Sequence, residues 1–388
     1  MTSNTETVKV KKTSWMQKID VRKYTMIIAL IGIWILFTVL DKTGTYLSAR
    51  NLSNLFRQMA VTSILAIGML MILVDRHIDL SLGSLVGLTG GVCAILMYKL
   101  SVPFGLAILL TLGLGAILGA WTGMWVTKGV PAFIASLGGL LAYRGIIMGL
   151  TKGVTIPANA SAFRAIGTAY LNSITSWIIG IIACTFLVYN TFKKRKDRIS
   201  YGFKVRSKSM EIFILVIYLV LLVIFVAVMD AYKGIPVPIL IVLVVGLIFT
   251  FITNKTQFGR QVYAIGGNSE AARLSGINVK KKTLMIFVIS GFLASLAGII
   301  FTARLGSATP DAGNMFELDA VASCVIGGTS LLGGEGTVFG AVLGALVMAS
   351  IDNGMSMLNT ESFWQYIVKG LILIVAVFID IQSKKKSA

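Results

Sequence analysis

Histidine, cysteine and charged residues are all scarce in this chain, and each shortage excludes a class of protein. The 388 residues include one histidine and three cysteines. A lone histidine, His77, excludes zinc motifs that need a histidine pair. Cys93, Cys184 and Cys324 all lie in apolar runs without paired spacing. We therefore expect no disulfide framework and no metal site, and we interpret His77 as an interfacial polar residue, with a proton relay as the alternative.

Two common motifs of catalysis are also missing. No Gly-Lys dipeptide occurs, so the phosphate-binding loop GxxxxGK[ST] is absent, and no Gly-x-Ser-x-Gly nucleophile elbow occurs either. The sequence therefore predicts no enzyme activity and no cofactor bound by this chain. A membrane enzyme is the least favoured class.

Charged residues make up 13% of the chain, against about 25% in a soluble domain. Hydrophobic residues make up 56%. Long apolar segments, each continuous rather than alternating, occupy residues 24–40, 58–74, 80–98, 103–127, 131–150, 174–192, 210–229, 236–253, 284–303, 318–332, 334–352 and 363–380. A helical span needs about 20 such residues. The pattern predicts an all-α, polytopic transmembrane helical bundle.

The positions of Lys and Arg predict the orientation. With the N-terminus inside, cytoplasmic segments hold 25 of the 35 basic residues, which is the usual bias. We expect a cytoplasmic tail over 1–23, a transmembrane domain over 24–380 and a second cytoplasmic tail over 381–388. The basic excess favours contact with anionic membrane lipid, and no feature favours nucleic acid.

The sequence is compatible with two numbers of transmembrane spans. Segments 318–332 and 334–352 are separated by little more than Gly333, and the first is short. They form either one re-entrant hairpin, with about ten spans elsewhere, or two tilted spans, giving twelve. Both solutions leave the C-terminus cytoplasmic.

Glycines recur at every fourth position in both halves of the chain. Gly115, Gly119 and Gly123 form one set, and Gly336, Gly340 and Gly344 form the other. Such stripes let a neighbouring backbone approach closely, and they suggest duplicated halves.

Ionisable residues inside the apolar runs are few. Arg144 is expected to face the bundle interior, and Lys369 to extend to the interface. Carboxylates such as Asp79 and Asp319 lie at segment ends, where we expect water. A carrier driven by protons or sodium usually needs carboxylates near mid-membrane, so the sequence favours an external energy source.

Two kinds of residue are candidates for lining a solute path. They are polar residues in or near the apolar runs, and tryptophans on a helix that carries a glycine stripe. Trp121 and Trp125 lie one helical turn apart, where they would stack on a sugar ring or anchor the helix at the interface. The candidates are Asp79, Ser81, Trp121, Trp125, Arg144 and Asp319.

A polar loop at residues 254–283 separates two membrane-length runs. Asn268 or Ser269 suits a helix N-cap, Glu270 a first turn and Gly276 the position after a helix end. We expect a helix of about two turns that docks a cytoplasmic partner, or one that rests on the membrane surface.

The same loop carries a family resemblance. Glu270-Ala271-Ala272, followed by Gly276, resembles the EAA-type segment by which importer permeases contact their ATPase, although no Leu-Pro follows. The chain also resembles the monosaccharide ABC-importer permeases of the ribose, galactose and xylose group. The matching stretches are Tyr46–Asn51, His77–Ser84, Tyr263–Asn278, Val325–Ser330, Ser350–Met357 and Phe363–Gly370.

The resemblance implies a permease homodimer in the bacterial plasma membrane, with a cytoplasmic ABC ATPase that uses the ATP and an extracytoplasmic sugar-binding protein. D-Xylose is the implied sugar, with ribose, galactose or glucose as alternatives and an ion-coupled secondary carrier as the rival class. The residues implied in ATPase docking are Gly267, Asn268, Glu270, Ala271, Ala272, Arg273 and Gly276.

Overall fold

The computed structural model describes residues 21–203, 205 and 207–385. The predicted tails fall largely outside these residues, at 1–20 and 386–388. The helices are α1 (Val21–Leu40), α2 (Ala49–Val74), α3 (Leu82–Tyr98), α4 (Phe104–Thr127), α5 (Ala132–Thr151), α6 (Ser161–Thr168), α7 (Ser173–Ser200), α8 (Lys208–Asp230), α9 (Val237–Lys255), α10 (Gln257–Gly267), α11 (Ser269–Leu274), α12 (Val279–Leu305), α13 (Phe316–Ile326), α14 (Val338–Met357) and α15 (Ser362–Lys385). Two short strands, β1 (Ile156–Pro157) and β2 (Ser307–Ala308), pair antiparallel.

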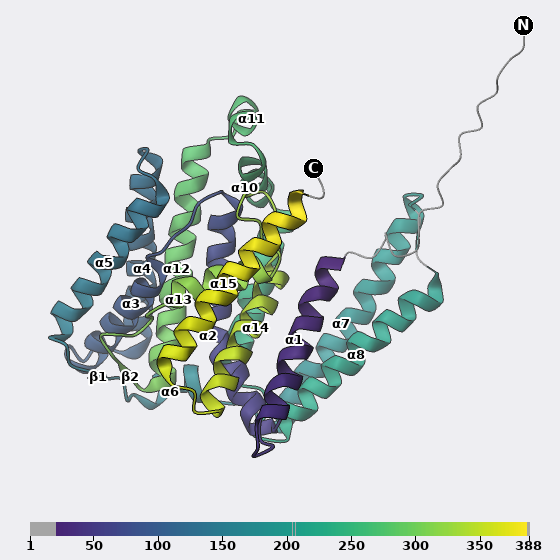
Figure 1. Ribbon diagram of the computed structural model, residues 1–388, viewed down its shortest axis with the longest axis horizontal. Helices are drawn as coiled ribbons and strands as arrows, with labels where there is room; N and C mark the ends of the chain where they lie inside the picture. The colour runs from purple at the N-terminus through teal and green to yellow at the C-terminus, as the bar shows by residue number, and fades with distance from the viewer. Residues whose placement is uncertain (1–20, 204, 206, 386–388) are drawn as a thin grey trace, which may run out of the picture.

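Within the described residues, nine helices are long and apolar enough to cross a membrane, and the fold is the predicted polytopic bundle. Helices α10 and α11 lie at one end, which we call the coupling face, and the end of α15 points toward the same side (Figure 1). Helix α6 and the two strands lie at the opposite end, the outer face (Figure 1). The bias of Lys and Arg assigns the coupling face to the cytoplasm.

Helices α2–α5 and α12–α15 have the same order of elements in opposite directions. Each set begins with a long helix, followed by a non-helical segment, a short helix (α3 or α13) and two longer helices. Helix α4 packs on α12, α14 packs on α2, and α2 and α12 pack on each other. The fold therefore contains an inverted repeat of the kind found in many transporters.

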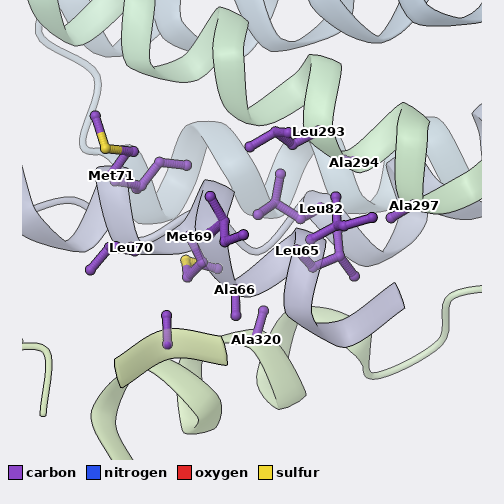
Figure 2. Packing of buried hydrophobic residues seen from close by; sticks show 14 of the residues in the cluster. Leu65, Ala66, Met69, Leu70, Met71, Leu82, Leu293, Ala294, Ala297 and Ala320 are labelled. Atoms are coloured by element: carbon purple, nitrogen blue, oxygen red, sulfur yellow. The ribbon is translucent and has the colours of Figure 1, made fainter. Parts of the chain in front are cut away.

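The core lies where the two repeats meet. Figure 2 shows Leu65, Met69 and Leu70 of α2 near Leu293 of α12, with Ala320 of α13 on another side. All five side chains are buried in one cluster. Because lipid tails are as apolar as leucine, close packing rather than escape from water holds these helices together.

Glycine allows the closest helix crossing. Gly119 of α4 and Gly291 of α12 face each other so tightly that a Cβ on either would overlap the backbone of the other helix. The predicted packing of the first stripe is thus confirmed. The second stripe is only partly helical, since Gly336 precedes α14 with φ 155°, whereas Gly340 and Gly344 pack on the backbone at the end of α13.

Residues 306–337 pass from one face to the other. Ser307 pairs with Pro157 at the outer face, whereas the Gly334 amide donates to the Val74 carbonyl at the coupling face, 2.9 Å away. Helix α14 then returns, and its Asn353 bonds Asn51 near the start of α2. Of the two topologies that the sequence left open, the described residues follow the one with twelve passes, in which α13 is a broken span.

Helices α7 and α8 form a hairpin set apart from this bundle (Figure 1). They pack mainly on each other, and α8 has a small contact with α2. Only 11% of the α7 span and 17% of the α8 span is buried. Most of the hairpin surface is therefore available to lipid.

Candidate functional site

Helix α11 projects from the coupling face and displays the loop residues. Asn268 caps it, because its Oδ1 accepts from the Ala271 amide at 3.0 Å, and Gly276 follows its end with φ 82°. These features confirm the helix predicted from the sequence. Ala272 is buried and fixes the helix to α12, whereas Leu274 is 77% exposed.

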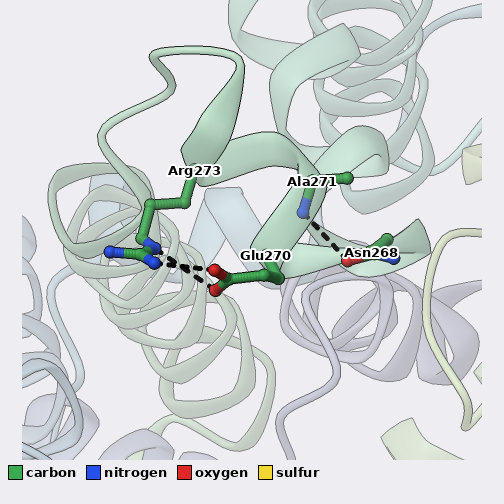
Figure 3. Close-up of polar contacts among 4 residues, drawn as sticks. All are labelled: Asn268, Glu270, Ala271 and Arg273. Carbon is green, nitrogen blue, oxygen red and sulfur yellow. Dashed lines mark hydrogen bonds and ion pairs between the residues drawn. The ribbon is translucent and has the colours of Figure 1, made fainter.

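Glu270 and Arg273 form an ion pair on the outside of α11 (Figure 3). Nη2 of Arg273 lies 2.6 Å from Oε1 of Glu270, and both side chains are about two-thirds exposed. The hydrogen bond from Arg273 lowers the pKa of Glu270, so the carboxylate stays ionised at neutral pH. An exposed pair contributes little to stability. Its groups are instead available to another protein.

Beneath α11, the chain makes a close backbone junction that the sequence analysis missed. Arg76, just beyond α2, donates to the carbonyl oxygens of Gly266 and Gly267 at 2.6 Å each. Gly266 has no room for a Cβ, which would overlap the Val74 carbonyl. The Gly334 amide also bonds to this carbonyl. We call Val74, Arg76, Gly266, Gly267 and Gly334 the coupling junction.

The coupling junction joins the docking helix to both repeats. Helix α10, which leads into α11, meets the end of α2 from the first repeat and the α13–α14 loop from the second. Tyr263 strengthens the second contact by donating to the Gly336 carbonyl at 2.8 Å. A displacement of α11 would therefore be transmitted through α10 to both repeats at once.

Asp75 and His77 lie beside the junction. Thr283 donates to Asp75 at 2.7 Å, and Nε2 of His77 is 3.7 Å from the same carboxylate. Burial raises the pKa of Asp75 to about 7, although the bond from Thr283 opposes this, and burial lowers the pKa of His77. His77 is thus a partly buried group near a carboxylate, and its role as a relay stays a prediction.

Three of the predicted path residues gather inside the bundle. Asp79 accepts from the amide and hydroxyl of Ser81 at 2.8 and 2.6 Å, just before α3. Arg144 of α5 faces inward and donates to the carbonyls of Pro310 and Ala312 at 2.9 and 2.8 Å. Arg144 lies where Gly87 of α3 meets Ala312, and Gly139 of the same helix as Arg144 packs on Ser81. The part of Asp79, Ser81 and Arg144 in a solute path stays a prediction.

Asp319 lies in a separate cluster, with Lys369 of α15 and Asp352 of α14. Nζ of Lys369 is 2.9 Å from Asp319 and 3.0 Å from Asp352. The prediction that Lys369 extends to the interface is wrong, because these carboxylates hold it in the bundle. The expectation of water around Asp79 and Asp319 is also wrong, since they are 1% and 3% exposed. Their helices begin inside the bundle rather than at its surface.

The two tryptophans lie elsewhere. Trp121 and Trp125 contact each other edge to face, with ring centroids 5.7 Å apart, and are 53% and 38% exposed on α4. No interaction joins them to the interior polar groups. Tyr143 of α5, by contrast, is buried, and its hydroxyl bonds Thr122 at 3.0 Å.

Comparisons with known proteins agree with this architecture. The xylose transport system permease protein XylH of Escherichia coli (strain K12) is 45% identical over 375 residues, covering 96% of this chain and 95% of that protein. XylH of Haemophilus influenzae is 46% identical over 374 residues, covering 96% and 99%. The ribose import permease protein RbsC of H. influenzae is 36% identical over 340 residues, covering 86% of each. No solved structure matches.

A family model also matches most of the chain, over residues 51–377. This region contains both repeats, except for the first two residues of α2 and the end of α15. It also contains the α7–α8 hairpin and the docking helix. The chain therefore belongs to the family of permease components described as "Branched-chain amino acid transport system / permease component".

Proposed function

We propose that this chain is the membrane subunit of an ATP-driven D-xylose importer in the bacterial plasma membrane. The observation that carries the proposal is a capped, charged helix, α11, presented at the cytoplasmic end of a permease bundle and joined through α10 to both of its repeats. The identity to relatives named as xylose permeases supports the choice of sugar.

The energy enters through α11. A separate ABC ATPase binds ATP and contacts Glu270, Arg273 and the neighbouring exposed residues, and this chain binds no cofactor. When the ATPase subunits close, they push on α11, and the coupling junction passes the movement to α2 and to the α13–α14 loop. Movement of one repeat against the other would alternate access to the interior.

The sugar descends from an extracytoplasmic binding protein through the bundle. Asp79, Ser81 and Arg144 supply fixed polar groups on the path, and Asp319 lies on its far side with Lys369. Trp121 and Trp125 line the path only if a partner surface covers α4, which favours a second permease copy.

A second copy of the chain completes the path. Helix α5 presents Gly138, Gly145 and Gly149 to open space, and α15 has no buried residues in its span. The two helices are equivalent in the inverted repeat and flank the interior polar groups. Small residues on an exposed helix allow close helix packing, which supports a homodimer along this side.

Anionic lipid surrounds the assembly. The cytoplasmic end of α7 carries Lys193, Lys194, Arg195 and Lys196, next to the exposed aromatic side chain of Phe192. Basic residues that flank a span attract anionic headgroups by about 1 kcal/mol each.

Reconstitution tests the proposal. Proteoliposomes with the chain, the ATPase and the binding protein should take up xylose when ATP is supplied, and exclude ribose, galactose and glucose. Glu270→Lys should reduce uptake about tenfold or more and weaken ATPase association. Arg76→Ala should reduce uptake while the ATPase stays bound. Asp197→Lys, a charge reversal on the exposed end of α7, is the matched control and should leave uptake unchanged.

Two outcomes would overturn the proposal. Uphill uptake by the chain alone in an ion gradient would establish the ion-coupled carrier, for which Asp319 offers a buried carboxylate and Asp352 a partly buried one. Normal uptake by both Glu270→Lys and Arg76→Ala would remove α11 and the junction from the mechanism. Transport of another monosaccharide would change only the sugar.

A further inference from the structure

A polar pocket opens at the outer face, at the end of the bundle opposite α11. Its volume is about 430 Å³, and α2, α12 and α14 form its walls. The polar lining residues are Asn51, Asn54, Arg57, Gln58, Arg304, Asn353 and Ser356. Asn51 and Asn353 bond each other in both directions, at 2.8 and 3.0 Å, so their amides are already paired.

The two arginines of this pocket have no counter-charge. No carboxylate lines the pocket, and neither Arg57 nor Arg304 forms an ion pair within the described part of the chain. Arg57 donates to the Tyr170 hydroxyl at 3.0 Å and to the Gly167 carbonyl at 3.3 Å, both uncharged. Its Nε, and Nη1 of Arg304, are buried without a hydrogen-bond partner.

This arrangement is unfavourable for the chain by itself. A buried N–H without a partner destabilises a protein, and two guanidinium groups in one pocket repel each other. Elsewhere the chain pairs its buried cation, as Lys369 does with two carboxylates. Arg57 lies over the Tyr170 ring and Arg304 over the Phe301 ring, so both have only uncharged partners among the described residues. A ligand that supplies the negative charge best explains the pair.

The chemistry of the ligand follows from the two arginines. A guanidinium presents a fork of N–H donors that matches a carboxylate, and two of them favour a negative charge over a neutral sugar. The helices that form the pocket are among the most buried of the bundle, with 83%, 61% and 72% of their spans covered. A lipid headgroup would have to leave the bilayer to reach it, whereas a soluble protein approaches it directly from water.

We propose that Arg57 and Arg304 form an anchoring pocket for an acidic side chain of the extracytoplasmic sugar-binding protein. The proposal rests on the proposed function, because that function supplies this partner. Arg57 belongs to the first repeat and Arg304 to the second, on the two central helices. One bound carboxylate would therefore contact both repeats at the outer face, as α10 does at the coupling face.

The test measures binding of the sugar-binding protein that supports xylose uptake to the full chain in nanodiscs. Arg57→Gln and Arg304→Gln should each weaken binding about tenfold or more, because each leaves the carboxylate with half of its donors. Arg164→Gln is the matched control, since Arg164 is exposed on α6 at the same face. It should change binding less than twofold.

A second measurement separates docking from folding. The melting temperature of the isolated Arg304→Gln variant should equal or exceed that of the wild type, because the substitution removes an unpaired cation. Neutralising one acidic residue of the binding protein should weaken binding to the wild type and have little further effect on Arg304→Gln.

Three results would overturn the inference. Unchanged affinity in both pocket variants would remove the anchoring role. An equal loss in Arg164→Gln would show general attraction to a basic surface. Stabilisation of the wild type by acetate, without any loss of protein binding in the variants, would assign the pocket to a free anion. In each case, ATP-driven uptake by the wild type would leave the proposed function intact.

Discussion

The central helices and the α7–α8 hairpin both lie within the membrane region, yet they differ in how apolar their sequences are and in how much of each helix is buried. Helix α8 is the most apolar of the nine long helices, and only 17% of its span is buried. Helix α14 is the least apolar, and 72% of its span is buried. Between these two helices, the more apolar one is the more exposed to lipid, whereas the buried α14 carries small and hydroxyl-bearing residues that allow close packing.

The comparison extends to charge. The bundle holds Lys369 between two carboxylates, at 18% exposure and away from either end of α15. The hairpin places its ion pair, Arg195 with Glu211, near the cytoplasmic ends of α7 and α8. The same kind of interaction should therefore have a large effect in one region and a small effect in the other.

A glycine substitution should give the largest difference. Gly119→Leu would force α4 away from α12, since a Cβ there already overlaps the Phe287 carbonyl. We expect loss of the folded bundle, measured as monodisperse protein after detergent extraction. Gly113→Leu, on the same helix but with open space around it, should extract normally. Equal yields of the two variants would contradict the close crossing.

The buried ion pairs come next. Lys369→Met leaves Asp319 and Asp352 without their cation, which should destabilise the fold by about 3–5 kcal/mol. The melting temperature in detergent measures this. Adding Asp319→Asn and Asp352→Asn should restore much of the loss, because no buried charge then remains unpaired. A triple variant that is less stable than Lys369→Met would show that Lys369 acts through packing alone.

A matched pair of leucines compares the two regions directly. Leu70 of α2 is fully buried, whereas Leu221 of α8 is 57% exposed. Leu70→Ala should cost about 2–5 kcal/mol through lost contacts and a cavity. Leu221→Ala should cost less than about 0.5 kcal/mol, as exposed substitutions usually do. Similar shifts in melting temperature would mean that α8 is covered by a partner.

The sequence predicted the features that depend on residues close together in the chain, and it missed the features that depend on contacts between distant residues. The spans follow from apolar length, and α11 follows from Asn268, Glu270 and Gly276, all within nine residues. Arg76 was missed because its partners, Gly266 and Gly267, are about 190 residues away and offer only backbone carbonyls. Asp319 was misplaced because the end of an apolar run was taken as the membrane surface, whereas α13 begins inside the bundle.

The smallest effect should come from the ion pair of the hairpin. Arg195→Gln removes the cation that pairs with Glu211, but both side chains are about one-fifth exposed at the cytoplasmic end of the helices, where water and salt are close. We expect a loss of at most about 1 kcal/mol, which shrinks as salt is raised. The melting temperatures of wild type and variant at low and high salt measure it. A loss as large as that of Lys369→Met would mean that the end of the hairpin is held in a dry interface, and the contrast between the two regions would then reflect a missing partner rather than exposure to lipid and water.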